Sequence, residues 1–306
     1  MAPTQQGSIR LFQFGGIQVY LHWSWFIIAL VEFNNRTNAY RSLVWNALEY
    51  LTLFGIVLVH EFGHSLACRQ VGGRADRIVL WPLGGVAYVS PPQRPGAMLW
   101  SIAAGPLVNV VLAPILIVTL VLARQAGLIA TAHDAYLFLR AICYINIGLL
   151  IFNLLPIYPL DGGQILRSLL WFIFGRARSL MITAIVGIVG VVGLIALAVA
   201  FRSIWMGIIA AFILLNCWGG LMQARMLGRV AKLPRRGGFA CPSCHQPPPL
   251  GPLWRCAKCF KPFDTFESHA VCPHCGAAFP VTQCLDCGEA RPLSEWNAPP
   301  PVISSS

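Results

Sequence analysis

The sequence predicts a polytopic α-helical membrane protein, with about six transmembrane helices, followed by a small cytosolic domain rich in cysteine. Three observations support this fold class. The chain of 306 residues is 57% hydrophobic and only 11% charged, which is too little charge to cover a soluble domain of this length. Its apolar residues gather in long runs, as expected where lipid is the solvent. Four Cys-x-x-Cys pairs follow Phe239 and mark the separate domain.

Six apolar runs are candidates for membrane-spanning helices, which need about 20 residues each. We expect the first run to be retained as a span, because it lacks the small-residue cleavage site of a signal peptide. The six runs are Val19–Phe33, Leu43–Ala67, Ala97–Ala123, Tyr136–Ile157, Leu180–Phe201 and Ile204–Met222.

The positive charges predict the orientation of the chain. If the N-terminus is cytosolic, thirteen arginines and lysines near the spans face the cytosol and five face the opposite side. Cytosolic loops are enriched in these residues, so we expect both termini in the cytosol. The thiol-rich domain then lies in a reducing compartment, where thiols can hold metal. Interfacial arginine also explains the net charge of +11, and no nucleic-acid partner is expected.

Composition divides the chain into four parts. Gly73–Val89, between the second and third spans, mixes β-branched residues with Gly84 and Gly85, which predicts short extended segments and a turn near the membrane face. Pro234–Gly238 has the composition of a linker. The predicted parts are a membrane-embedded domain at 1–230, a linker at 231–240, a cysteine domain at 241–295 and a disordered tail at 296–306.

The second span contains an H-E-x-x-H motif formed by His60, Glu61 and His64. Residues four apart share one face of a helix, so both imidazoles can bind one metal ion and Glu61 can reach a water on it. Ionisable side chains deep in an apolar run are candidates for function, because burying them is costly. The alternative is a satisfied polar cluster between helices. The motif predicts the zinc site of a metalloprotease.

Such a site needs a third protein ligand and an open position for water. The best candidate is Asp161, which follows the fourth span. With both termini in the cytosol, the second and fourth spans run in the same direction, so the three ligands share the cytosolic side. The spacing alone leaves an equal alternative, in which Asp161 caps or turns the chain before Gly162 and Gly163.

Taken together, the motifs resemble the site-2 protease family of intramembrane zinc metalloproteases. The H-E-x-x-H motif is followed by Asn153-x-x-Pro156-x-x-Pro159-Leu160-Asp161-Gly162-Gly163, and Ala104-Gly105-Pro106 in the third span matches the family as well. The resemblance covers roughly residues 10–225 and implies that Asp161 is the third zinc ligand.

The resemblance also implies an activity. A family member hydrolyses peptide bonds in or near the transmembrane segments of membrane-protein substrates, in regulated intramembrane proteolysis, with Glu61 as the catalytic acid and base. Asn153 would hold the substrate backbone or the developing oxyanion, and Gly84 and Gly85 would resemble the family's membrane-associated strands near the cleft.

Two other classes of function compete with this reading. One is a zinc transporter or zinc-sensing membrane protein, against which Glu61 argues, because a transport site does not need that residue. The other is an inactive scaffold that binds membrane proteins, against which the complete ligand set argues.

The tail predicts two structural zinc ions besides the catalytic one, because two Cys-x-x-Cys pairs make one tetrahedral site. A redox role for the pairs is the alternative. We expect successive pairing, with the first two pairs on one zinc and the last two on the other, an arrangement that resembles a double zinc ribbon. We expect the ribbon to contact a protein partner or gate the cytosolic cleft. The pairs are Cys241/Cys244, Cys256/Cys259, Cys272/Cys275 and Cys284/Cys287.

Overall fold

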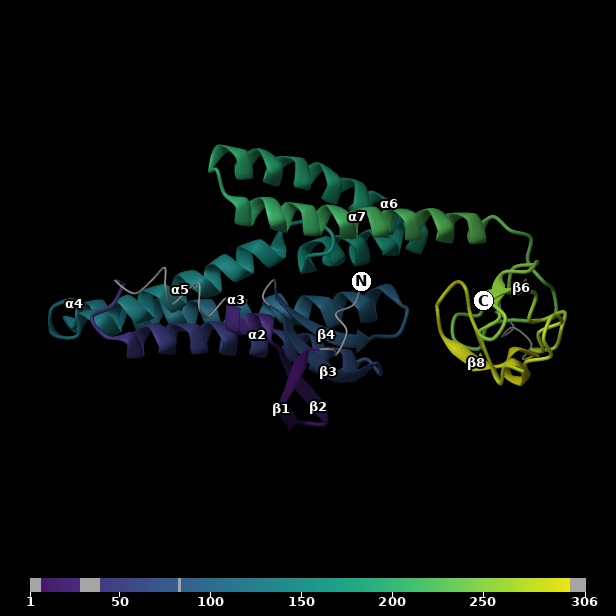
Figure 1. Ribbon diagram of the computed structural model, residues 1–306, viewed down its shortest axis with the longest axis horizontal. Coiled ribbons are helices and arrows are strands. Elements are labelled where there is room, and N and C mark those ends of the chain that lie inside the picture. The colour runs from purple at the N-terminus through teal and green to yellow at the C-terminus, as the bar shows by residue number, and fades with distance from the viewer. Residues whose placement is uncertain (1–6, 28–38, 82–83, 298–306) are drawn as a thin grey trace, which may run out of the picture. The chain divides into compact units, whose positions relative to one another are not determined.

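The computed structural model describes residues 7–27, 39–81 and 84–297, and the chain divides into two compact units. The first unit comprises Met1–Gly175 and Ile182–Gly220 and carries the long helices and a four-stranded sheet. The second comprises Arg176–Met181 and Leu221–Ser306 and carries the cysteine-rich ribbons (Figure 1).

Five of the described helices are long and apolar enough to cross a membrane, which confirms five of the six expected spans and the multi-pass class. A single turn of helix, α4 (Leu128–Thr131), lies between the second and third of them. The five are α2 (Leu43–Gln70), α3 (Pro95–Gln125), α5 (His133–Leu154), α6 (Asp161–Ala200) and α7 (Ile204–Ala231).

The expected start of the first span, at Val19, is wrong. Ile17–His22 forms the strand β2, in which buried Ile17 and Val19 alternate with half-buried neighbours, as the two-residue period of a strand requires. Residues 24–27 are helical, and 28–33 of the expected span lie outside the described residues. An apolar run rich in β-branched and aromatic residues fits either a strand or a helix until its pairing partner is known.

The strands form one mixed sheet in the order β1-β2-β3-β4. β1 (Ser8–Phe14) pairs antiparallel with β2, β2 pairs parallel with β3 (Arg74–Trp81), and β3 pairs antiparallel with β4 (Gly84–Ser90). Parallel strands need a long crossover connection, and the connection between β2 and β3 contains α2. The last two strands confirm the extended segments that were expected between the second and third spans.

Helix α2 begins at an N-cap, where the side chain of Ser42 accepts a hydrogen bond from the N–H of Val44. The helix lies alongside α3 and α5 (Figure 1). Its buried residues include His60, Glu61 and His64, which therefore face protein and not lipid.

Helix α6 begins directly after a tight turn that follows α5, and it is broken at one residue. Gly175 has φ 76° and ψ 171°, a left-handed backbone that favours glycine, so α6 consists of two helical parts. The second part contains the fifth expected span, Leu180–Phe201, and the first part carries Asp161 at its first position.

The second unit is small and contains two hairpins and a short helix. Its buried residues are the cysteines together with aromatic side chains, among them Trp254, Phe266 and Trp296. Such a core is too small to fold a domain easily, and bound metal supplies much of the missing free energy. The elements are β5 (Trp254–Arg255), β6 (Pro262–Phe263), β7 (Val281–Gln283), β8 (Ala290–Pro292) and the 3-10 helix η1 (Leu293–Asn297).

Arginines outside the cysteine region bind acidic residues and carbonyls inside it. Arg235 makes two hydrogen bonds to the Asp286 carboxylate, at 2.6 and 3.0 Å, which raise the pKa of Arg235 so that the pair stays charged. Arg236 donates to Asp264 at 2.6 Å. Arg176, beside the break in α6, donates to the main-chain carbonyl of Asp286.

Candidate functional site

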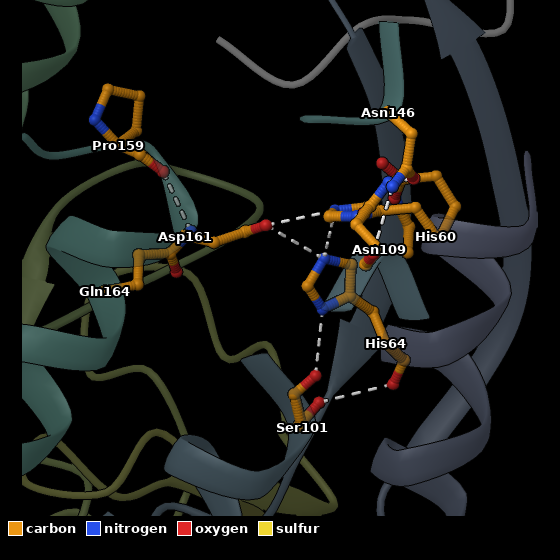
Figure 2. A network of polar contacts seen from close by, with 10 residues as sticks. His60, His64, Ser101, Asn109, Asn146, Pro159, Asp161 and Gln164 are labelled. Carbon is orange, nitrogen blue, oxygen red and sulfur yellow. Dashed lines mark hydrogen bonds and ion pairs between the residues drawn. The ribbon is translucent and has the colours of Figure 1, made fainter. Parts of the chain in front are cut away.

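Three side chains from two helices converge in the first unit. His60 and His64 lie one turn apart on α2, and Asp161 lies at the start of α6 (Figure 2). The Asp161 Oδ2 atom is 3.0 Å from His60 Nε2 and 3.4 Å from His64 Nε2, and the two Nε2 atoms are 3.1 Å apart. Ligands about 2.0–2.1 Å from a tetrahedral zinc ion lie about 3.3 Å from one another, so the three atoms fit one zinc ion.

The opposite ring nitrogens of the two histidines each face an oxygen acceptor, which leaves the converging Nε2 atoms as acceptors in the neutral rings. His64 Nδ1 donates to the main-chain carbonyl of Ser101 at 2.9 Å, and His60 Nδ1 donates to Asn109 Oδ1 at 2.6 Å. With the proton on Nδ1, each neutral ring turns a lone pair from Nε2 toward the carboxylate of Asp161. Two lone pairs and a carboxylate repel one another unless a cation lies between them, and zinc satisfies all three.

The tight turn before α6 brings Asp161 to this position. A Cβ on Gly162 would lie 2.3 Å from the main-chain oxygen of Leu154, so the first turn of α6 packs directly on the end of α5. Between the two open readings of Asp161, the structure therefore favours a metal ligand, because the carboxylate points at both histidines and not at its own backbone (Figure 2).

Gly105 of α3 makes room for both imidazoles. A Cβ at this position would lie 2.2 Å from His64 Nε2 and 2.8 Å from His60 Nε2. Only glycine lets the α3 backbone approach the ligand atoms this closely, which explains why Ala104-Gly105-Pro106 accompanies the histidine motif.

Glu61 lies against the edge strand of the sheet. Its carboxylate accepts a hydrogen bond from the N–H of Ala87 in β4 at 3.0 Å, and a Cβ on Gly85 would lie 2.2 Å from its Cγ atom. The side chain is 6% exposed, so the strand covers the predicted acid and base. The expectation that the double-glycine region lies near the site is consistent with this placement of Gly85.

For the other two residues predicted to contact substrate, Gly84 and Asn153, the structure shows less. Gly84 begins β4, where it pairs with Trp81. Asn153 is half-buried in the last turn of α5, and no hydrogen bond of its side chain is found among residues 7–27, 39–81 and 84–297. Their roles stay predictions.

The sequence interpretation missed three residues around the histidines. Ser101 and Asn109 of α3 and Asn146 of α5 are each 0% exposed, and all three belong to the hydrogen-bond network of the ligands (Figure 2). The available signal was the presence of asparagine inside apolar spans, where an amide must find a polar partner.

The eight tail cysteines form two clusters, and the expected successive pairing is wrong. One cluster joins the first pair to the fourth, and the other joins the second pair to the third. The nesting follows from contacts that bring the ends of the domain together, such as the hydrogen bond from Ala240 N to the Trp296 carbonyl at 3.0 Å. The clusters are Cys241, Cys244, Cys284 and Cys287, and Cys256, Cys259, Cys272 and Cys275.

The sulfur spacing in both clusters suits metal and not disulfides. The Sγ atoms of Cys241 and Cys287 are 3.7 Å apart. Those of Cys256 and Cys275 are 3.5 Å apart. A disulfide brings sulfurs to about 2.05 Å, whereas thiolates on a tetrahedral zinc lie about 3.8 Å apart.

Each pair also has the same backbone turn. The residue after the second cysteine donates its N–H to the carbonyl of the first cysteine and has a left-handed backbone. This turn folds the two thiols of a pair toward one point. The four residues, with their φ values, are His245 (58°), Phe260 (62°), Gly276 (69°) and Gly288 (81°).

Comparison with known proteins gives a family for the membrane unit. The model of peptidase family M50 matches residues 49–131 and 122–197. A zinc metalloprotease of Methanocaldococcus jannaschii is 34% identical over 180 residues, which are 59% of this chain and 50% of that protein. Stage IV sporulation protein FB of Bacillus subtilis is 36% identical over 118 residues, 38% of each chain. The chain thus spans half or less of the length of these two relatives.

A solved structure is also similar. The site-2 protease from Methanocaldococcus jannaschii has 27% sequence identity, with a TM-score of 0.49 over 70% of this chain and 95% of its own.

Proposed function

The chain belongs to peptidase family M50, the site-2 proteases, and on this premise we propose that it is a zinc metalloprotease that hydrolyses peptide bonds in or beside the membrane-spanning segments of other membrane proteins. One observation carries the proposal. Three ligand atoms converge within 3.0–3.4 Å of one another, and Glu61 follows the first histidine, inside helices apolar enough to cross a membrane.

His60, His64 and Asp161 would hold the catalytic zinc. When bound, zinc lowers the pKa of a water molecule toward about 7 and polarises the scissile carbonyl. Three protein ligands would leave a fourth zinc position open for water, as catalytic sites do and structural sites do not.

Glu61 moves the proton. Its carboxylate takes a proton from the attacking water and returns it to the leaving amine. The N–H of Ala87 holds one carboxylate oxygen, which leaves the other for this transfer. Asn153 at the end of α5 is the proposed second donor to the developing oxyanion.

The substrate must expose its backbone to reach this site. A spanning helix satisfies its own peptide groups, so its bonds are hidden until it unwinds. We therefore propose substrates with helix-weakening residues in a single span, which is held near Gly84 and Gly85 while it is cut.

The arginine bias supports a cytosolic location for both termini. The two cysteine clusters would hold two structural zinc ions, and the ribbon is a candidate surface for a protein partner.

The test compares membrane-protein fragments in cells that express the wild type, Glu61→Gln or Glu49→Gln. Glu49 is a matched control, because it is a second buried glutamate on α2 and bonds the Tyr40 hydroxyl. We expect Glu61→Gln to keep its zinc and to lower cleavage by at least about 100-fold. A single-span protein should then accumulate uncut only in Glu61→Gln.

Two outcomes would contradict the proposal. Equal fragment patterns in all three strains under several stresses would favour an inactive scaffold that binds membrane proteins without cutting them. Zinc flux across liposomes carrying the purified chain, unaffected by Glu61→Gln, would favour a transporter.

A further inference from the structure

Two asparagines bury their amides inside the membrane unit without touching the three ligand atoms. Asn109 of α3 and Asn146 of α5 are both 0% exposed. Burying an amide without hydrogen-bond partners is unfavourable in proteins. The two residues avoid this cost by bonding each other: Asn109 Nδ2 donates to Asn146 Oδ1 at 2.8 Å, and Asn146 Nδ2 donates to the Asn109 main-chain carbonyl at 3.0 Å (Figure 2).

One of these contacts fixes the direction of all the others. The main-chain carbonyl of Asn109 can only accept, so the Asn146 group that faces it must be the NH₂ group. The Asn146 oxygen then faces Asn109, whose facing group must be its own NH₂. The remaining group of Asn109 is an oxygen, and this oxygen faces His60 Nδ1 at 2.6 Å.

The chain of hydrogen bonds ends on a metal-ligand side chain, at His60 Nδ1. Because Asn109 presents an oxygen, His60 carries its proton on Nδ1, and its Nε2 lone pair is free for the metal. His64 needs only one hydrogen bond to fix the same tautomer, because its Nδ1 donates directly to the Ser101 carbonyl. His60 has no such fixed acceptor. An amide that rotated by 180° would offer it a donor in place of an acceptor.

We propose that Asn146 is a positioning residue that sets the tautomer of His60 through Asn109. The inference rests on the zinc site of the proposed function and adds a residue two side chains away from the metal. Asn146 stops the Asn109 amide from turning its NH₂ group toward His60, and so it fixes which end of that amide His60 meets.

The test measures zinc loading of the purified full-length chain at buffered free zinc concentrations, with zinc counted by mass spectrometry. The loading step that His60→Ala lacks reports the membrane site, and the remaining steps report the ribbons. We expect Asn146→Leu to raise the free zinc needed for half-loading of that step by about 10-fold, the low end for residues that support a ligand. Asn216→Leu is the matched control, because Asn216 is a half-buried asparagine on α7 whose side-chain amide donates to the Phe212 carbonyl of its own helix.

The decisive variant is the double substitution Asn109→Asp with Asn146→Leu. A carboxylate accepts on both oxygens, so its orientation no longer matters, and we expect zinc loading to return to the wild-type range. A role in packing alone predicts the reverse, because the double variant has lost both hydrogen bonds and gained a buried charge. The visible spectrum of Co²⁺ in the same site should follow the zinc result.

The outcomes separate this inference from the proposed function. Wild-type loading in Asn146→Leu, or no recovery in the double variant, would overturn the relay while leaving the protease intact. If wild type and His60→Ala load the same amount of zinc, the metal site itself is refuted. Zinc loading of the ribbons and a single size-exclusion peak show that each variant is folded. If leucine at position 146 prevents folding, Asn146→Ala is used in its place.

Discussion

Gly105→Ala should remove the zinc of the membrane site without unfolding the protein. The added Cβ would lie 2.2 Å from His64 Nε2 and 2.8 Å from His60 Nε2, whereas ordinary contact begins at 3.4 Å. An imidazole must therefore move by about 1 Å, and metal sites tolerate deviations of only about 0.2 Å in ligand distance. The Ser101 and Asn109 acceptors oppose such a movement, because they hold the far side of each ring.

The control is Gly148→Ala on α5, where a Cβ would meet nothing within 4 Å. Replacing a glycine by alanine inside a helix stabilises the helix by about 0.5–1 kcal/mol, so both variants should fold. We expect about three zinc ions per chain in wild type and Gly148→Ala, and about two in Gly105→Ala, from the three ligand groups. Mass spectrometry of the purified chain counts them. Full zinc occupancy in Gly105→Ala, with unchanged cleavage, would refute the close approach of α3 to the ligands.

Two further predictions concern the ribbons. Nested clusters predict that Cys241→Ser with Cys287→Ser removes one zinc, whereas Cys241→Ser with Cys256→Ser removes two; the opposite counts would restore successive pairing. Arg235→Ala breaks the two hydrogen bonds to Asp286 and should lower ribbon stability by about 1 kcal/mol, seen as faster zinc release to a chelator. Arg291→Ala should leave release unchanged, since its 3.7 Å contact with Glu289 is exposed; equal effects of the two variants would show that the Asp286 contact contributes nothing special.

The spans and the metal ligands could be read from the sequence because both obey local rules. A run of about 20 apolar residues predicts a spanning helix whatever surrounds it. The spacing of His60 and His64 places both on one helical face, and only Asp161 needed family resemblance to connect it across about a hundred residues.

The errors arose where a partner far along the chain decides the structure. Val19 reads as the start of a helix until β3 is known to lie beside it. The four cysteine pairs look alike, and their combination depends on contacts between the two ends of the domain. Asn109 and Asn146 have no spacing rule, because their bond depends on how α3 meets α5.

Because α6 is broken at Gly175, the ribbon unit is more than a C-terminal tail. The second unit is not one continuous piece of chain: Arg176–Met181, just after Gly175, belongs with Leu221–Ser306. The helix that starts with Asp161 therefore contributes a segment to the ribbon unit, and Arg176 loses its Asp286 acceptor if the C-terminus is removed. Truncation after α7 is thus also an alteration of α6. The two units share a polypeptide in the manner of an insertion, so removal or replacement of the ribbon also affects the residues just after Gly175.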